Sequence, residues 1–440
     1  MMRHNELAAI VGTEWVRAGD ASPAYVVDGV RPQWIVWPGT VEEVAAVLRQ
    51  AHEAGWAVVP AGYGMGLSLG NPPERVDLVI STTRLHQILD YEPADLTASV
   101  QAGCSLGQFN QTIGQHGQWL PLDPLRPERS TLGAVAAVND FGSLRLGFGL
   151  VRDYVIGLQM VQADGRLIKS GGRVVKNVAG YDLNKLFVGS FGTLGIITQV
   201  NLKVRPRPET QATCLISSEQ VTALNELAQA VAASELSPAA MEWLSPRAAQ
   251  QLQVPCPAHE VALLVRFMDS QPSVQYQVRR LENIARAHDL TTEPLNEPTS
   301  EQLWPSVRDF SVRPEANFTI RVSVRPADAA RALGLLQEPL SNLTEDLGLV
   351  AHYRSGVVLA QGRFDATDSQ CTKLAERLRQ LRFRCSQMNG SLIIQRAPVA
   401  LKKRIDVWGE VGPTAEMMRA LKQQFDPRRL LNPGRFVAGI

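Results

Sequence analysis

Four glycines stand close together directly before a strand-like run, and this stretch constrains the fold more than any other. In KNVAGYDLNKLFVGSFGTLGIITQV (176–200) they are Gly180, Gly189, Gly192 and Gly195. Glycine loses more conformational freedom on folding than any other residue, so regular elements disfavour it. Such a density therefore predicts a place where the fold requires bare backbone.

A second glycine-bearing stretch, PAGYGMGLSLG (60–70), follows a run that reads as a buried strand. Glycines allow backbone amides to turn toward a ligand, and a phosphate group can be held in this way without a metal ion. The stretch is not the nicotinamide-binding Rossmann sequence, because after Gly62 and Gly64 the third glycine is Gly66, one position too early. The prolines that follow also exclude the helix that this motif requires. Residues 60–66 therefore predict a phosphate-binding loop of another kind.

Helical and strand-like patterns interleave along the chain, which indicates an α/β or α+β fold. TVEEVAAVLRQAHEAG (40–55) has a threonine cap, early glutamates and a closing glycine, and so predicts a helix. In IITQVNLKV (196–204) the period-two alternation predicts a half-buried strand. The residues expected to share one face of this strand are Ile196, Val200, Leu202 and Val204.

A domain boundary is predicted at RPRPE (205–209), where two prolines that cannot sit inside a sheet end the strand pattern. Between 210 and 400, strand-like runs alternate with helical ones, which predicts a sheet covered by helices. The tail contains a helix, stopped by Asp426 and Pro427, and then a turn. We therefore divide the chain into residues 1–209, 210–400 and 401–440.

Composition narrows the classes of function. The 440 residues carry a net charge of +1, so no polyanionic partner such as nucleic acid is implied. The five cysteines are scattered and form no C-x-x-C pair, which argues against disulfides, structural zinc and iron–sulfur ligation. Electron chemistry would then rest on a bound organic cofactor. Neither a membrane-length apolar run nor a secretory signal is visible, so we expect a cytoplasmic protein.

Six separated motifs follow one another in a characteristic order. They are PAGYGMG (60–66), PLDP (121–124), STLGAVAA (130–137), VRDYVIG (151–157), GGRVVKNVAGYDL (171–183) and GSFGTLGIIT (189–198). This set resembles the flavin-binding domain of the vanillyl-alcohol oxidase and p-cresol methylhydroxylase (PCMH) superfamily over residues 30–208. Together with the ending FDPRRLLNPGRF (425–436), the last two motifs are similar to the FAD-binding subunit of the bacterial-type glycolate oxidase complex.

This resemblance implies an α+β fold in three parts. Residues 1–209 would form a PCMH-type FAD-binding domain of two subdomains. Residues 210–400 would form an α/β cap domain, with a helix-covered antiparallel sheet, on the substrate side. Residues 401–440 would be a C-terminal segment that returns to the FAD-binding domain.

The resemblance also implies which residues contact FAD. The amides of Gly62–Gly66 would cradle the pyrophosphate, and Gly192 and Gly195 would leave room for the flavin. The full set is Pro60, Ala61, Gly62, Tyr63, Gly64, Met65, Gly66, Pro121, Leu122, Asp123, Thr131, Leu132, Gly133, Asn177, Gly180, Tyr181, Gly192, Gly195, Ile196 and Ile197. Lys176 and Asp182 would either contact the cofactor or pair with each other. The first glycine loop contains no histidine for covalent attachment, so we expect noncovalent FAD.

Catalytic relatives carry a histidine motif similar to H-x-G-x-G-N-x-H in the second domain, and this chain lacks it. Its histidines in that region stand alone: His259, His288 and His352. Oxidation of a 2-hydroxy acid requires a cation for the carboxylate and a base for the hydroxyl proton. Arg321, in the strand-like run FTIRVSV, is the candidate catalytic residue. Weaker candidates are Arg308, Arg354 and Arg363.

The resemblance implies an FAD-binding subunit of a glycolate (2-hydroxy acid) dehydrogenase complex. Its partners would be a catalytic flavoprotein subunit and an iron–sulfur subunit that receives the electrons, and these partners would dock it peripherally at the inner membrane. Two alternatives stay open. One is a self-sufficient FAD-dependent dehydrogenase for D-lactate or another 2-hydroxy acid, and the other is a noncatalytic assembly subunit that keeps the flavin fold.

Overall fold

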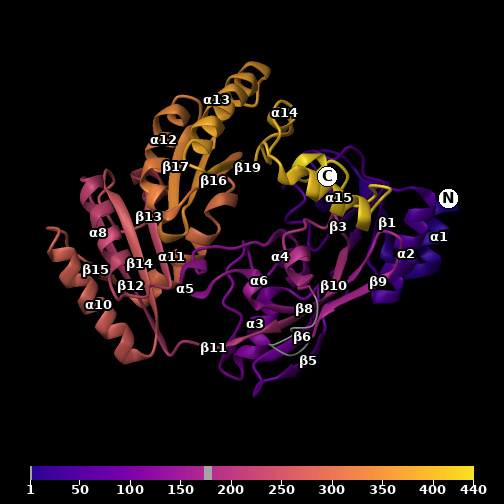
Figure 1. Cartoon of the computed structure of the whole chain (residues 1–440), viewed down its shortest axis with the longest axis horizontal. Coiled ribbons are helices and arrows are strands. Elements are labelled where there is room, and N and C mark those ends of the chain that lie inside the picture. The colour runs from indigo at the N-terminus through magenta and orange to yellow at the C-terminus, as the bar shows by residue number, and fades with distance from the viewer. Residues whose placement is uncertain (1, 173–180) are drawn as a thin grey trace. The chain divides into compact units, whose positions relative to one another are not determined.

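The computed structural model describes residues 2–172 and 181–440, which form two compact units (Figure 1). The first unit consists of residues 1–141, 150–207 and 410–440. The second consists of residues 142–149 and 208–409. Compared with the division expected from the sequence, the second unit also includes a short segment from the first third of the chain, and it extends to 409 instead of 400.

The first unit contains a mixed sheet in the order β1-β2-β4-β3 and an antiparallel sheet in the order β5-β6-β10-β8-β9, with β7 and β11 as a separate pair. The strands are β1 (Val16–Ala18), β2 (Trp34–Val36), β3 (Val58–Ala61), β4 (Leu78–Ser81), β5 (Ile88–Glu92), β6 (Thr97–Gln101), β7 (Gln118–Trp119), β8 (Val155–Val161), β9 (Leu167–Gly171), β10 (Ile196–Lys203) and β11 (Arg205–Pro206). The helices are α1 (Met2–Val11), α2 (Val41–Ala54), α3 (Leu106–Gly114), α4 (Leu132–Val138), α6 (Val151–Tyr154), α7 (Asn184–Phe187) and α15 (Thr414–Phe425).

Helix α2 forms where the capping pattern predicts it. The Thr40 side chain accepts a hydrogen bond from the Glu43 amide, which satisfies one of the unpaired donors at the helix start. Gly55 ends the helix in the left-handed conformation with φ of 69°. Val44 and Leu48 point into the core beside the four-stranded sheet. The prediction of a helix over 40–55 is therefore confirmed.

Strand β10 differs from its predicted pattern at its first residue. Ile197 pairs with Met160 of β8, but the register then shifts by one residue before Gln199. A bulge of this kind turns the preceding side chains to the other face. Ile197 consequently packs into the core of the five-stranded sheet with Val200, whereas Ile196 packs into the core of the four-stranded sheet. The prediction that Ile196 shares one face with Val200 is wrong for this reason.

Pro206 also departs from expectation, because it lies in a ladder. It pairs with Gln118 in the two-residue strands β11 and β7. A proline is tolerated there because the ladder has only two short edge strands and requires no central amide donor. The break between the units follows directly, after Arg207.

The second unit is built on one antiparallel sheet of eight strands in the order β15-β12-β14-β13-β17-β18-β16-β19. The strands are β12 (Thr210–Ser218), β13 (Ala240–Leu244), β14 (Val261–Asp269), β15 (Glu293–Leu295), β16 (Phe318–Ser323), β17 (Glu345–His352), β18 (Val357–Arg363) and β19 (Ser391–Arg396). The helices are α5 (Arg145–Phe148), α8 (Val221–Ala233), α9 (Pro246–Gln251), α10 (Gln271–Arg286), α11 (Glu297–Arg308), α12 (Ala329–Ser341), α13 (Asp368–Ser386) and α14 (Val399–Lys402).

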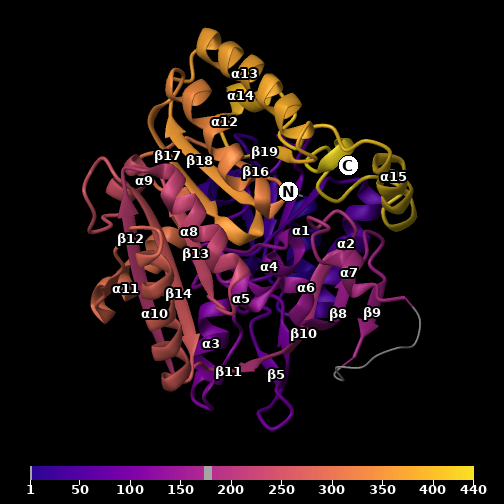
Figure 2. The ribbon, with the colours of Figure 1, turned by 60° about the vertical axis from the view of Figure 1, so that its left-hand side comes forward.

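Helices α8, α10, α12 and α13 cover one face of this sheet, which we call its first face (Figure 2). Their apolar residues form one core with the inward strand residues, for example Leu281 of α10 and Leu374 of α13 with Ile320 of β16. Because side chains alternate along a strand, the residues between these strand positions point to the second face. Arg321 is one of them.

Candidate functional site

The first glycine loop (60–66) begins where strand β3 ends. Pro60 and Ala61 are the last two residues of β3. The carbonyl oxygen of Gly62 accepts hydrogen bonds from the Tyr25 hydroxyl at 3.3 Å and from Ser81 Oγ at 3.1 Å. These bonds come from a distant segment and from the neighbouring strand β4. The start of the loop is therefore fixed to the sheet.

The backbone of this loop presents its amides in a way that suits an anion. The N–H groups of Gly62, Tyr63, Gly64, Met65 and Gly66 donate no hydrogen bond to any residue that the structure describes. Gly64 has φ of 83°, a value that favours glycine. Consecutive amides without a partner in such a turn form a concave anion site. The residues present thus fit a pyrophosphate group.

The segment predicted to line the cofactor at 131–133 lies against this loop. A Cβ on Gly62 would be 2.6 Å from Thr131 Oγ1, so only glycine permits this approach. The Leu132 amide donates to the Cys104 carbonyl oxygen and the Gly133 amide to that of Ala102, both at 2.8 Å. Thr131 also caps α4 by accepting from the Ala134 amide. The structure therefore brings the predicted residue Thr131 beside Gly62.

The third predicted segment is residues 189–198, and the structure shows why Gly192 and Gly195 are required there. Gly192 has φ of 67°, and a Cβ there would lie 2.7 Å from Pro60 Cγ. A Cβ on Gly195 would overlap the Met160 side chain. At both positions a Cβ would face the protein itself, and the expectation that these glycines leave room for the flavin stays a prediction. Gly192 permits close packing against β3, the strand that leads into the first glycine loop.

The remaining predicted residues are less closely gathered. Pro121, Leu122 and Asp123 follow β7 in an irregular segment, and Ile196 and Ile197 are buried at the start of β10. Tyr181 is 96% exposed, so the described chain offers it no packing. Asn177 and Gly180 lie outside the described residues, as does Lys176. Asp182 forms an exposed ion pair with Lys185 at 3.1 Å.

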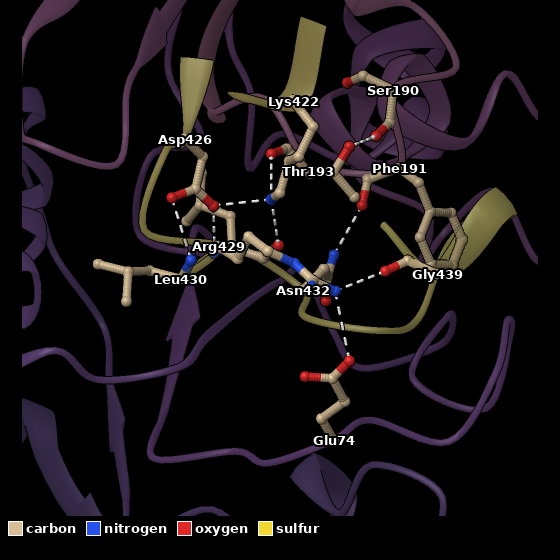
Figure 3. A network of polar contacts seen from close by, with 11 residues as sticks. Glu74, Ser190, Phe191, Thr193, Lys422, Asp426, Arg429, Leu430, Asn432 and Gly439 are labelled. Carbon is tan, nitrogen blue, oxygen red and sulfur yellow. Dashed lines mark hydrogen bonds and ion pairs between the residues drawn. The ribbon is translucent and has the colours of Figure 1, made fainter. Parts of the chain in front are cut away.

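The C-terminal segment contributes a buried polar network that sequence reasoning missed (Figure 3). Lys422 Nζ donates to the carbonyl oxygens of Thr193 and Leu431, both at 2.8 Å, and to Asp426 Oδ2 at 2.7 Å. Asp426 also accepts from the backbone amides of Leu430 and Leu431. Burial lowers the pKa of Lys422, and the neighbouring Asp426 opposes this change. The network ties α15 to the glycine segment at Thr193.

Asn432 and Arg435 extend this network to the first glycine loop. Asn432 Nδ2 donates to the Phe191 carbonyl oxygen at 2.6 Å, directly before Gly192. Arg435 donates to Asn432 Oδ1 at 3.0 Å and to the carbonyl oxygens of Leu67 and Leu69 at 2.8 and 2.7 Å. Burial lowers the pKa of Arg435 to about 10. One segment therefore holds both glycine stretches in place. The ending FDPRRLLNPGRF, which contains both residues, is the sequence signal that pointed here.

In the second unit, Arg321 lies half-buried on β16, between β18 and β19, on the second face of the sheet. The same face carries Glu242 of β13, His352 of β17 and Gln361 of β18, and we call these four residues the polar strip. His352 Nδ1 lies 2.8 Å from both carboxylate oxygens of Glu242. Glu242 is fully buried and was not predicted as a site residue.

The other candidates of this unit have surface environments or local partners. His259 forms an exposed pair with Glu219 at 2.8 Å, and His288 is half-buried. Arg308 pairs with its neighbour Asp309. Arg354 follows β17 and is half-buried, and Arg363 ends β18 with its side chain exposed. Of these histidines, only His352 joins the polar strip.

Comparison with known proteins places this geometry in a family. The family described as "FAD binding domain" matches residues 32–171, and that described as "FAD linked oxidases, C-terminal domain" matches residues 207–436. The second match covers more than half of the chain. The chain belongs to the FAD-linked oxidases. FAD is therefore its cofactor, and the loop amides at 62–66 fit the pyrophosphate of FAD. These matches confirm the superfamily to which the six motifs pointed.

Several curated relatives of this FAD-linked oxidase align over nearly its whole length. The glycolate oxidase subunit GlcD of Bacillus subtilis is 27% identical over 95% of this chain and 91% of its own length. A probable mitochondrial D-lactate dehydrogenase of Danio rerio is 28% identical over 92% and 84%. A D-2-hydroxyglutarate dehydrogenase of Xanthomonas citri is 27% identical over 96% and 91%.

Solved structures agree on the fold. A p-cresol methylhydroxylase structure with bound substrate superposes with a TM-score of 0.78 over 99% of this chain and 96% of that one, at 15% identity. An alkyldihydroxyacetonephosphate synthase gives 0.75 over 98% and 85%, at 17% identity. The predicted α+β fold of the PCMH type is thus confirmed. Among the described residues, no helix is long and apolar enough to cross a membrane.

Proposed function

We propose that this FAD-linked oxidase is the FAD-binding subunit of a glycolate or other 2-hydroxy acid dehydrogenase complex. The observation that carries the proposal is the row of five available amides at 62–66, held against Thr131 in a chain of this family. Relatives named for glycolate, D-lactate and D-2-hydroxyglutarate support a 2-hydroxy acid as substrate. FAD held by these amides would supply the two-electron acceptor that oxidation of such an acid requires.

In this proposal FAD is bound noncovalently and Arg321 binds the substrate carboxylate. The first glycine loop offers Tyr63 and Met65 but no histidine for attachment. Cys104, whose carbonyl oxygen holds Leu132, has a fully buried thiol, and burial raises the pKa of this thiol to about 11. A thiol of this kind has little thiolate to attack a flavin. Flavin that stays with the protein after acid precipitation would contradict noncovalent binding.

The electrons are proposed to leave through partners, a catalytic flavoprotein subunit and an iron–sulfur subunit. The five cysteines stand singly in the sequence, so this chain supplies no cysteine set for a cluster of its own. The complex would dock peripherally at the inner membrane. Affinity purification from the native cell should therefore recover both partners. Recovery of neither would refute the complex.

The decisive measurement is an anaerobic visible spectrum of the purified chain before and after addition of glycolate and then D-lactate. Bleaching of the flavin bands without partners would favour a self-sufficient dehydrogenase. Yellow protein that bleaches only with its partners would favour the subunit. Protein that never bleaches, even within the complex, would refute 2-hydroxy acid oxidation and leave an assembly role.

A further inference from the structure

Residues 368–408 of the second unit concentrate positive charge that the composition of the whole chain conceals. The stretch contains nine lysines and arginines and three acidic residues, so its net charge is +6. Because the whole chain has a net charge of +1, all other residues together carry −5. A nearly neutral total therefore does not exclude an anionic partner for this part of the chain.

Helix α13 directs much of this charge toward solvent. Its buried side, with Leu374 and Leu381 as examples, packs into the core on the first face of the sheet. Lys373, Arg377 and Arg384 follow one another at spacings of four and seven residues, so they form one stripe along the helix. Lys373 and Arg384 are exposed, and Arg377 is half-buried. Because α13 covers the sheet (Figure 2), the stripe points away from it.

The cations of this surface are less engaged by the protein than its acids are. The side chains of Lys373 and Arg384 form no hydrogen bond or ion pair with any residue that the structure describes, and the same holds for Lys403, directly after α14. Helix α14 packs against α13. Asp368, in contrast, pairs with an arginine, and Asp406 accepts hydrogen bonds from two backbone amides. The charge left without a partner on this surface is therefore mainly positive.

Phe383 lies among these cations on the outward side of α13. Its exposed fraction is 67%, the highest of any large apolar side chain that the structure describes in the second unit. Arg384 follows it directly, and Arg379 lies one helical turn before it. A single exposed apolar residue is common on protein surfaces. An aromatic ring flanked by cations on an amphipathic helix, however, is the pattern of helices that lie on anionic bilayers.

An acidic protein is the alternative occupant, and this surface fits it less well. Stable protein interfaces contain an apolar core, are depleted in lysine, and bury about 800 Å² on each partner. Among the described residues on the outward side of α13, Phe383 is the only large apolar one, and Arg379, Gln380 and Gln387 around it are exposed and polar. A layer of lipid headgroups requires no such core, because phosphates meet the cations and one ring enters between the headgroups.

We propose that the outward side of α13, with Lys373, Arg377, Phe383 and Arg384, is a surface that binds anionic phospholipid. The helix lies parallel to the bilayer plane, its cations contact lipid phosphates, and Phe383 enters the headgroup region. Its 19 residues span about 28 Å of this plane. This inference goes beyond the proposed function, in which partner subunits dock the chain at the membrane, because here the chain itself contacts lipid. It involves no residue of the FAD site.

The test is co-sedimentation of the full FAD-loaded chain, without partner subunits, with vesicles of phosphatidylcholine and phosphatidylglycerol in equal parts. Vesicles of phosphatidylcholine alone are the neutral reference. The chain should bind only the anionic vesicles at about 0.1 M salt, and binding should be lost at about 1 M salt, where charges are screened within about 3 Å. Each cation near an anionic surface contributes roughly a factor of five. The combined variant Lys373→Gln, Arg377→Gln, Arg384→Gln should therefore bind roughly 100-fold more weakly.

Two further sets of variants separate the aromatic contribution from that of overall charge. Phe383→Ala should weaken binding about 10-fold, because the ring no longer enters the headgroup region. Phe383→Trp should keep the affinity, since tryptophan also favours the bilayer interface. The matched control removes three exposed cations outside α13, as Lys169→Gln, Arg279→Gln and Arg419→Gln. It changes the net charge equally and should bind within about two-fold of wild type, because distant charges are screened.

The flavin content and the urea midpoint of every variant should match those of wild type, which excludes misfolding as the cause of weaker binding. The inference is overturned if the wild-type chain does not bind the anionic vesicles, or if the α13 variant binds them as well as the matched control does. It is also overturned if wild type ignores the vesicles and the α13 variant loses a partner subunit during affinity purification, which would assign this surface to an acidic protein. Flavin reduction by a 2-hydroxy acid tests the proposed function separately, because none of the α13 substitutions lies in the FAD-binding unit.

Discussion

The buried Lys422–Asp426 pair makes the strongest stability prediction, and Lys422→Met is the variant that tests it. Lys422 is 3% exposed and Asp426 is fully buried. The substitution keeps most of the side-chain volume but removes three hydrogen bonds and leaves the Asp426 carboxylate without its cation. Breaking one partner of such a pair costs about 3–5 kcal/mol. Because two backbone amides still donate to Asp426, we expect the lower end, about 3 kcal/mol.

The Lys422→Met substitution should also affect FAD binding, because the Thr193 carbonyl oxygen beside Gly192 loses its hydrogen-bond donor. We therefore expect weaker FAD binding together with earlier urea unfolding. The assay follows the fluorescence of the flavin that the protein releases during urea unfolding. The FAD concentration is held fixed, because bound FAD itself stabilises the folded protein. Arg419→Met, an exposed basic residue on the same helix α15, is the control and should behave as wild type.

A double variant makes the reasoning sharper. In Lys422→Met combined with Asp426→Asn, the buried carboxylate is neutral and no longer requires the cation. The two changes should therefore cost less together than their sum, with an interaction of roughly 0.5–3 kcal/mol. If Lys422→Met unfolds at the wild-type urea concentration, or if the two changes simply add, the role given to this pair is refuted.

Three further predictions concern other parts of the chain. Gly62→Ala pushes a methyl group into Thr131, and at an overpacking cost of roughly 1–3 kcal/mol it should weaken FAD binding about 10-fold or more by fluorescence titration. Gly334→Ala in α12, where a Cβ meets open space, should instead raise stability by roughly 0.5–1 kcal/mol, and an unchanged urea midpoint would contradict this. Burial raises the pKa of Cys104 and Cys385 to about 11 and that of Cys214 to about 12, from an ordinary 9.0. Unfolded thiols release protons first, so stability should fall as the pH rises from 9 to 11, and Cys104→Ala should reduce this slope in urea titrations.

Local sequence signals predicted those elements whose boundaries depend on their own residues. Helix α2 is specified by Thr40 at its start and by Gly55 at its end. Strand β13 was missed, because all five of its residues are buried and the run AMEWL therefore shows no alternation. Its place is fixed by pairing with β14 and β17, which a single sequence does not reveal.

In the candidate site, too, the local features were predicted and the long-range contacts were not. The glycines of both stretches were predicted, but the close packing of Gly192 against Pro60 was not, because this neighbour comes from elsewhere in the chain. Lys422 reaches Thr193 across 229 residues, and His352 reaches Glu242 across 110. No local pattern contains these pairings, because they arise from tertiary packing and strand register.

The two buried carboxylates, compared with each other, support different roles. Asp426 receives an ammonium group and two backbone amides, so the fold compensates its burial, as expected of a residue that holds a structure together. Glu242 receives a single ring nitrogen from the described residues, although it is buried as completely. An incompletely compensated charge is a cost that a purely structural position would be expected to shed, because an apolar residue serves packing as well. The contrast within one chain is therefore the reason to assign a scaffolding role to Lys422 and Asp426, whereas packing alone does not account for Glu242.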